Sequence, residues 1–326
     1  MFGGCSSSRN ASSGDDASAL LPGQKPKWIN SPQDYCGEQY WCAVGEGAGM
    51  MTAQTNARKN IALMLEASVK SNFQTTTTHQ QTTQGGGISG SSQQETTAMI
   101  QEATEETLRG VTIKEQFVAQ DTCYALASLD RRQAAKDLQE KIEEIDTKIE
   151  SLYQTGKRSS FYQMLKLIPG RNVLAEKVLT LSGKTLALPV AWREIQNQQR
   201  IYEAQRPAVK IVIDHEEDWA GRDKKNLQHL LQKVLTENGY QLSSKRPTFQ
   251  INVTADVRAE HLKVEGFIKR TWQISLKSER LADETSRGSL EAKAEATGRN
   301  DKDVWRQVEN DLAEQIGQQF LDLNLD

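Results

Sequence analysis

Cys5 is the residue of this 326-residue chain whose chemistry follows most directly from its neighbours. Phe2, Gly3 and Gly4 precede it, and small residues in these places are typical of sites where a signal peptidase cuts and the cysteine becomes a lipid-bearing thioether. The sequence therefore predicts lipidation of Cys5. A secretory signal also needs a basic segment and an apolar segment of about seven to fifteen residues, yet only four residues precede Cys5. Either the reading frame extends upstream of Met1 or Cys5 is an ordinary thiol.

A polar segment follows Cys5 and predicts a tether. Residues 6–27 are rich in Ser, Gly, Asp and Pro, which bury too little apolar surface to offset the entropy of ordering. A coil of roughly 22 residues has an end-to-end distance of about 25 Å. Ser6 follows the cysteine in place of an Asp, which favours the outer membrane over retention at the inner membrane. We expect residues 1–27 to be a disordered, lipidated tether that holds a periplasmic body at the outer membrane.

The remaining cysteines are Cys36, Cys42 and Cys123. They form no C-x-x-C pair and lack a histidine at zinc-site spacing, so no metal site is expected. An oxidising periplasm permits one disulfide among them. Cys42 and Cys123 lie in segments that both predict strands, whereas Cys36 and Cys42 are separated by a short loop, and the sequence does not choose between these pairs. Three buried thiols are the other alternative.

Two further groups of residues could do chemistry, and in each case a simpler interpretation is favoured. Gly45, Gly47 and Gly49 precede a predicted helix, as in a phosphate-binding turn, but the G-x-G-x-G spacing and the missing lysine favour a plain glycine turn. His215, beside the acidic residues 216–218, could bind a cation or act as an acid or base, but such runs are usually solvated loops. No G-x-S-x-G nucleophile motif is found. We expect no catalytic residues, cofactor or metal.

Composition and length exclude some classes of protein and predict the number of domains. A net charge of -3 argues against a dedicated nucleic-acid binder. No run of about 18 apolar residues exists, so no spanning helix is predicted and membrane attachment must come through lipid or a partner. The length predicts two or three domains.

The first folded block, residues 28–130, has a mixed pattern that predicts an α+β domain. A helix from about Ala53 places apolar residues four apart on one face. The capping pair Ser92 and Glu95 starts a second helix. The expected strands and loop are a strand at Tyr40–Val44, one at Asn72–Thr78, a low-complexity loop at 79–94, and two strands at Val111–Val118 and Thr122–Leu129.

The second block, residues 131–206, predicts a helical insert or hairpin. Its first helix carries an a/d stripe that needs a partner, formed by Leu138, Ile142, Ile145 and Ile149. A second helix is expected to break at Pro169 and Gly170. The stripe, together with Trp28 and Trp41 near the entrance of the first block, forms a possible interface. We expect a homo-oligomer.

The third block, residues 207–326, has the clearest pattern. Three segments alternate strictly between apolar and polar residues, which predicts antiparallel strands with one wet face and one covered face. Two amphipathic helices supply the cover, one ending at Gly239 and one beginning near Asn300. The order is β-α-β-β-β-α. The whole chain is thus predicted to be α+β, with two two-layer sandwich modules joined by a helical hairpin.

Four segments of the first block together resemble the LPP20-type lipoprotein domain. They are KPKWI at 25–29, YWCAVGEG at 40–47, AQTNARKNIA at 53–62 and DTCYALASLD at 121–130. That family includes outer-membrane lipoproteins and flagellar envelope proteins and has no catalytic residues to carry over. The third block is similar in pattern to a TolB amino-terminal or LptE-like module. The helical insert departs from the minimal LPP20 domain.

The resemblance and the residues imply a non-enzymatic, outer-membrane-anchored periplasmic lipoprotein. We expect it to be a structural or assembly component, a ring or disk, of an envelope machine such as the flagellar motor. Its partners would be copies of itself, other proteins of that machine and the outer membrane through lipid, with no nucleic acid. The alternative is a monomeric regulator or adaptor that binds a periplasmic synthase or a secretion partner.

Overall fold

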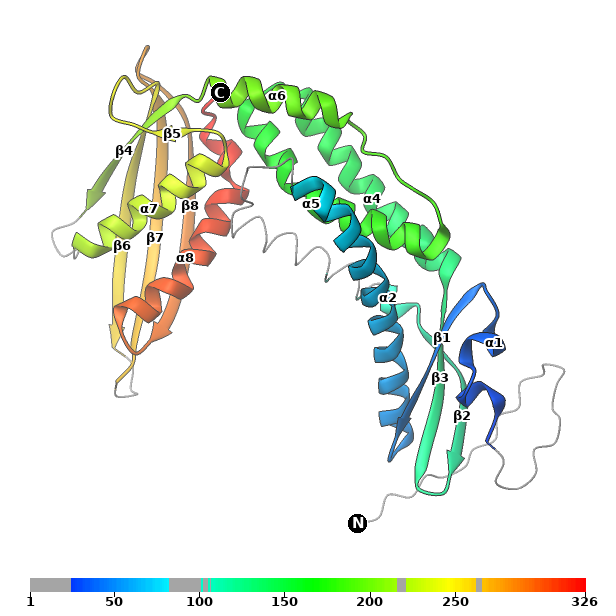
Figure 1. Ribbon diagram of the computed structural model, residues 1–326. Coiled ribbons are helices and arrows are strands. Elements are labelled where there is room, and N and C mark those ends of the chain that lie inside the picture. Colours follow the sequence, from blue (N-terminus) through cyan, green and yellow to red (C-terminus); the bar gives the residue numbers. More distant parts are fainter. Residues whose placement is uncertain (1–24, 82–100, 102–104, 106, 216–220, 262–265) are drawn as a thin grey trace. The chain divides into compact units, whose positions relative to one another are not determined.

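The computed structural model describes residues 25–81, 101, 105, 107–215, 221–261 and 266–326. Helices and two separate sheets confirm the predicted α+β class (Figure 1). Most of the predicted tether, the capping pair Ser92 and Glu95, and residues 82–94 of the predicted loop lie outside the described residues. The chain divides into two compact units, and the boundary crosses the helical hairpin between Asp146 and Thr147 and before Pro169.

The first unit contains a three-stranded antiparallel sheet in the order β1-β3-β2. Its elements in chain order are η1 (Lys27–Ile29), α1 (Pro32–Cys36), β1 (Tyr40–Gly47), α2 (Met50–Gln81), β2 (Thr112–Ala119), β3 (Thr122–Asp130), the first part of α4 (Arg131–Gln154) and the last part of α5 (Arg158–Ser182). Three of its predicted strands are therefore confirmed, with small shifts of their ends.

The predicted strand at Asn72–Thr78 is wrong, because α2 continues through this segment to Gln81. The helix begins with a strongly buried face, formed by Ala53, Ala57, Ile61 and Leu65. Once such a helix is established, each added residue gains a hydrogen bond at little further cost. That cooperative gain outweighs the weak β-propensity of the threonines. The predicted strand was based on that β-propensity.

Each face of the first sheet is covered by a different element. On one face Trp28 packs with Cys42, Tyr124 and Leu126, so η1 and α1 form a cover. The opposite face carries small residues of β1 and β3 and lies against α2 (Figure 1). The central strand β3 is therefore buried on both sides, whereas β2 remains partly exposed.

Gly45 and Gly47 lie within β1 and allow α2 to approach the strand closely. A Cβ atom built on Gly45 would lie 2.1 Å from the backbone nitrogen of Ala57 and 2.2 Å from the carbonyl oxygen of Ala53. At Gly47 the closest atoms are at 2.8 Å and belong to Thr52. Backbone, which cannot move aside, thus occupies the place of a side chain. These glycines serve helix packing and do not form the phosphate-binding turn considered from the sequence.

We predict that Gly45→Ala destabilises the first unit by about 3 kcal/mol or more, because the added methyl group overlaps backbone atoms of α2. Gly49→Ala is the matched control, since nothing lies within 4 Å of a Cβ there. Denaturant unfolding followed by circular dichroism measures both. Equal stability of the two variants would contradict the close packing of α2 on β1.

The hairpin helices α4 and α5 bury their apolar stripe inside the protein. Leu138, Ile142, Ile145 and Ile149 are each at most 8% exposed. The predicted break at Pro169 and Gly170 is wrong, because α5 runs through both residues. An interior proline costs a helix about 3 kcal/mol, and buried apolar residues on both sides offset this cost, namely Met164, Ile168, Leu174 and Val178.

Arg171 secures the helix just after Pro169. Its guanidinium group makes two hydrogen bonds to the carboxylate of Asp146, at 2.9 and 3.0 Å. It also donates to the carbonyl oxygens of Leu186 and Ala187. The buried arginine therefore has partners for its charge and fixes the segment that follows α5.

The second unit contains a five-stranded sheet in the order β5-β4-β6-β7-β8. β4 is parallel to β5 and β6, and the pairs β6-β7 and β7-β8 are antiparallel. Besides the remaining parts of α4 and α5, its elements are α6 (Trp192–Ala204), β4 (Ala208–His215), α7 (Gly221–Glu237), β5 (Gln241–Leu242), β6 (Phe249–His261), β7 (Ile268–Arg280), β8 (Thr285–Gly298), α8 (Asp301–Gln318) and η2 (Phe320–Leu323). β4 is the first strand of the predicted β-α-β-β-β-α order. Its parallel pairing and the short strand β5 were not predicted.

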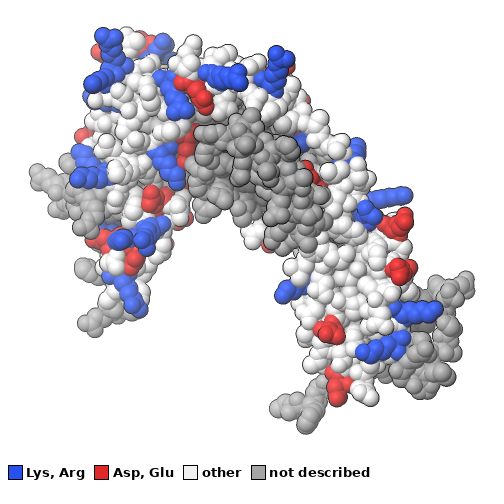
Figure 2. Space-filling view, in the orientation of Figure 1, with Lys and Arg blue, Asp and Glu red and all other residues white. Residues whose placement is uncertain are grey.

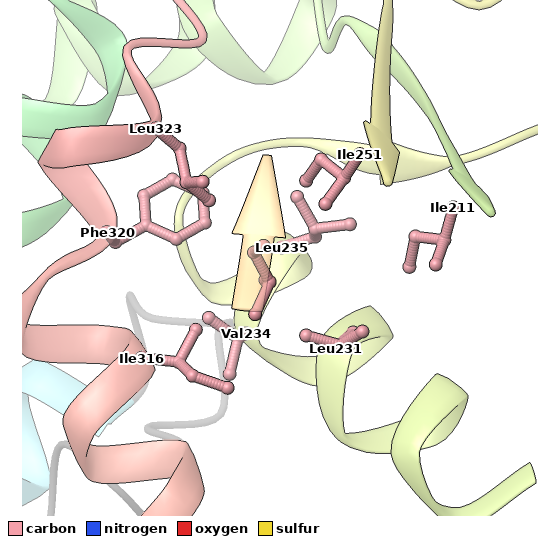
Figure 3. A pocket seen from close by; sticks show the side chains of 9 residues that line it. Ile211, Leu231, Val234, Leu235, Ile251, Ile316, Phe320 and Leu323 are labelled. Carbon is pink, nitrogen blue, oxygen red and sulfur yellow. The ribbon is translucent and has the colours of Figure 1, made fainter. Parts of the chain in front are cut away.

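Helices α7 and α8 lie on the same face of this sheet (Figure 1). Alternation places the apolar side chains of β6, β7 and β8 beneath them, including Trp272, which packs edge-on against Trp305 of α8. A gap of about 10 Å³ remains between α7, α8 and the sheet, and the apolar side chains labelled in Figure 3 surround it. The gap has room for one water-sized group and is not a ligand pocket.

Asp326 joins the end of the second unit to the start of α5. Its carboxylate accepts hydrogen bonds from the backbone nitrogen of Arg158 at 2.9 Å, from the Ser159 hydroxyl and from the Tyr240 hydroxyl at 3.1 Å. Burial, followed by the nearby Asp326 charge, raises the pKa of Tyr240. Asp326 thus occupies the exposed backbone donors at the N-terminus of α5.

Candidate functional site

The proposed lipid attachment point, Cys5, lies outside the described residues. The structure pairs Cys36 with Cys42 in a disulfide, with their Cα atoms 6.3 Å apart. The register explains why Cys42 does not pair with Cys123: Cys42 lies opposite Ser128, and Cys123 lies opposite Gly47. Because side chains alternate along a strand, Cys42 and Cys123 are on opposite faces of the sheet. The alternative of three free thiols is also wrong.

The residues proposed as an interface are mostly buried within the chain. Trp28 is only 5% exposed and belongs to the core beneath η1. Trp41 is half-buried and lies beside the guanidinium group of Arg131. Leu138, Ile142, Ile145 and Ile149 are buried in the hairpin. Intramolecular packing covers these five buried side chains, whereas Trp41 keeps part of its surface exposed, and the interface stays a prediction.

A polar depression of about 550 Å³ lies at the outer edge of β1 in the first unit. Helix α2 forms one wall, and the segment around η1 forms the other. Most of the lining side chains are polar or charged, and three are aliphatic. The lining residues are Lys25, Ile29, Asn30, Val44, Glu46, Asn56, Lys59, Asn60, Leu63 and Tyr124. Such a surface suits hydrogen-bonding groups rather than an apolar ligand.

Lys25 enters this depression where the described chain begins. Its Nζ atom donates a hydrogen bond of 2.7 Å to the Tyr124 hydroxyl and lies 4.7 Å from the centre of the Tyr124 ring. Tyr124 itself is almost fully buried in β3. The contact holds Lys25 against the sheet.

Side-chain amides cover the outer edge of β1, where a neighbouring strand would otherwise pair. Asn60 donates to the carbonyl oxygen of Val44 and Asn56 to that of Glu46, each at 2.8 Å. Further along, Gln33 donates to the carbonyl oxygen of Tyr40 and accepts from the backbone nitrogen of Cys42. An edge strand is a template for unwanted pairing, and these amides occupy its hydrogen-bonding groups.

The second unit covers the outer edge of β8 in the same way. Gln315 both accepts from the backbone nitrogen of Lys293, at 3.0 Å, and donates to its carbonyl oxygen, at 2.8 Å. Gln319 donates to the carbonyl oxygen of Glu291 and Gln307 to that of Thr297. Both sheets therefore have one edge covered by the amides of a helix packed close beside it.

Helix and strand geometry explains why the amides recur four residues apart. Four helical residues advance about 6.0 Å, and two strand residues advance about 6.8 Å. An amide at every fourth helix position can therefore reach every second residue of an adjacent strand, as with Asn56 and Asn60, or Gln315 and Gln319. These amide residues were not predicted from the sequence. Their four-residue spacing next to strands of small residues is the signal that could have found them.

Among the described residues, no three His, Cys, Asp or Glu side chains gather as metal ligands. Acidic residues 216–218 lie outside the described part, so the His215 cluster is not observed. On the visible face, Lys and Arg are interspersed with Asp and Glu (Figure 2). Of the helices that the structure describes, none is long and apolar enough to span a bilayer.

Residues 26–130 match the family model for the LPP20 lipoprotein. This match covers the first sheet with its covers η1, α1 and α2, and it confirms the resemblance derived from the sequence motifs. The TolB- or LptE-like pattern of the third block stays a prediction. A comparison with curated proteins gave no match.

Several solved structures are distantly similar. The minor lipoprotein from Acinetobacter baumannii is 19% identical, over 35% of this chain and 90% of that one, with a TM-score of 0.27. The secreted protein HP1454 from Helicobacter pylori is 10% identical, over 89% and 100%, with a TM-score of 0.35. A PelC dodecamer from Paraburkholderia phytofirmans is 8% identical, over 34% and 83%, with a TM-score of 0.28. At such scores none of them supports an argument about this chain.

We predict that Asn60→Ala lowers the free energy of unfolding by about 1 kcal/mol, because the carbonyl oxygen of Val44 loses its partner at a partly buried edge. The double variant Asn56→Ala/Asn60→Ala should lose about twice as much. Lys59→Ala is the matched control, since this exposed side chain lines the same depression without capping the strand. If all three variants unfold at the same denaturant concentration, the amides do not stabilise the edge.

Proposed function

We propose that this protein is a lipid-anchored envelope protein, attached through Cys5, that works by docking and assembly rather than by catalysis. The observation that carries the proposal is the match of residues 26–130 to the LPP20 lipoprotein family. The small residues before Cys5 and the polar segment after it support the anchor. In the part of the chain that the structure describes, no three His, Cys, Asp or Glu side chains gather as metal ligands.

The position of Lys25 gives the anchor a geometry. Nineteen residues lie between Cys5 and Lys25, and a coil of this length extends about 25 Å. Lys25 is held by Tyr124 beside the polar depression. A lipid on Cys5 would therefore keep the η1 end of the first unit within a few nanometres of the membrane.

Within this role we favour a structural component of a larger envelope assembly, such as a ring or disk of the flagellar motor, over a monomeric adaptor. The a/d stripe is buried and gives no support for assembly. The strand edges support it, because side-chain amides cover the outer edges of β1 and β8, whereas no described strand pairs with the outer edge of β4 beyond Val209. Proteins that cover some edges and leave others open can direct which surfaces associate.

Metabolic labelling with an alkyne-tagged palmitate tests the anchor in cells that express the full reading frame. We predict that the wild-type chain is labelled and floats with membranes, whereas Cys5→Ser is unlabelled and soluble, since it lacks the acceptor thiol. Ser6→Ala is the matched control and should keep the label. Mass spectrometry under non-reducing conditions detects the outcome that would contradict the anchor. A disulfide between Cys5 and Cys123 in the mature protein would rule out the thioether.

Cross-linking in intact envelopes separates a ring component from an adaptor. A ring component should give a ladder of products at multiples of the 36.4 kDa chain. An adaptor should give one product with a single unlike protein and no multiples. Light scattering of the lipidated protein in detergent measures the same stoichiometry in solution. A particle no larger than a monomer at high concentration would count against the ring.

A further inference from the structure

The outer edge of β4 is open over most of its length. β5 pairs only with Ala208 and Val209, at the beginning of the strand. From Lys210 to His215, β4 pairs with β6 on its inner side, and no described strand lies on its outer side. The exposed edge differs from the edges of β1 and β8, because none of the side-chain hydrogen bonds observed in the described residues covers it.

The backbone groups that face outward can be identified from the hydrogen bonds at the beginning of β4. Ser243 donates its backbone N–H to the carbonyl oxygen of Val209, on the β5 side. Because backbone groups of a strand alternate in direction, Ile211 and Ile213 also direct their N–H and C=O groups outward. These four groups are the unpaired donors and acceptors that a further strand would use.

The residues of this edge are complementary to themselves. In an antiparallel pair of two copies, centred on Val212, each Ile211 stands opposite Ile213 of the second copy. Their outward backbone groups then form about four hydrogen bonds, which is the narrow pairing of antiparallel strands. Lys210 stands opposite Asp214 of the second copy, and the two-fold axis repeats this pair. Two opposite-charge pairs thus flank an apolar centre.

Lys210 and Asp214 have no competing partners in their own sheet. Both are exposed and lie on the wet face, opposite the neutral residues Gln250 and Thr254 of β6. Neither makes an ion pair with another described residue. Lys269, elsewhere on this face, is paired: its ammonium group lies 3.2 Å from Glu295 and 3.3 Å from Glu260. The hydrogen bonds to Glu295 and Glu260 raise the pKa of Lys269.

We propose that two copies of this chain associate through the outer edges of their β4 strands, antiparallel about an axis at Val212, so that their sheets join into one. The pairing covers Lys210–Asp214 only, because β5 occupies the edge at Ala208 and Val209. It gives the assembly role proposed above a defined surface, but it rests on the sheet edge and not on the lipid. Failure of the dimer would leave the labelling of Cys5 unaffected.

So short a pairing buries little surface, and the dimer of the unlipidated chain should be weak, with a dissociation constant on the order of 10 to 100 µM. Attachment of both copies to one membrane raises their effective concentration and favours pairing there. The association should also weaken as salt is added, because its two charge pairs are at the surface.

Sedimentation equilibrium of the full Cys5→Ser chain, together with charge exchange, tests the pairing. Lys210→Asp places two aspartates opposite each other and should weaken dimerisation about tenfold or more. Asp214→Lys should do the same by opposing two lysines. The double variant Lys210→Asp/Asp214→Lys restores opposite charges across the axis and should restore the dimer. Both side chains are exposed, and circular dichroism of each variant checks that folding is unchanged.

A cysteine on the axis provides an independent test. In this register the Val212 residues of two copies form a non-hydrogen-bonded pair with Cα atoms about 4.5 Å apart, which is within the range of a disulfide. Val212→Cys should therefore give a covalent dimer on mild oxidation. Thr254→Cys, exposed on the neighbouring inner strand β6, is the matched control and should not.

A monomer at about 500 µM, or equal dimerisation of the two single charge variants and the wild type, would overturn the proposal. So would failure of the double variant to recover while it remains folded. Equal cross-linking of Val212→Cys and Thr254→Cys would assign the association to another surface.

Discussion

The close approach of a helix to an edge strand of small residues is the constraint on which most of this structure depends. In the first unit Gly45 has backbone of α2 where a side chain would be. In the second unit the alanines Ala292, Ala294 and Ala296 of β8 lie beneath α8. Small side chains bring the helix close enough for its amides to reach past the sheet to the strand edge. The packed cores and the covered strand edges therefore both result from the short distance between helix and strand.

Covered and open edges have different consequences for function. An edge whose carbonyl oxygens already accept from Asn56, Asn60 or Gln315 gains little by pairing with another strand. The open part of β4 retains its donors and acceptors, and its sequence is complementary to itself. The proposed dimer uses this edge, which agrees with the proposed role in assembly.

The two units contribute differently to the proposed role. The similarity to the LPP20 lipoprotein family lies within residues 26–130, and Lys25 is held by Tyr124 beside the polar depression of the same unit. The β4 edge belongs to the second unit. Attachment to the membrane and association with another copy are thus assigned to separate surfaces, which allows each to be altered without the other.

The sequence by itself determined the α+β class, the strands of alternating residues and the helices with apolar positions four apart, because period is a local property of the chain. It did not determine the continuation of α2 through Asn72–Thr78 or of α5 through Pro169, where packing outweighs local propensity. The Cys36–Cys42 pair and the amide-covered edges were decided only by the tertiary structure. Each depends on which faces and edges contact one another, and these contacts are made between residues that are distant in the sequence.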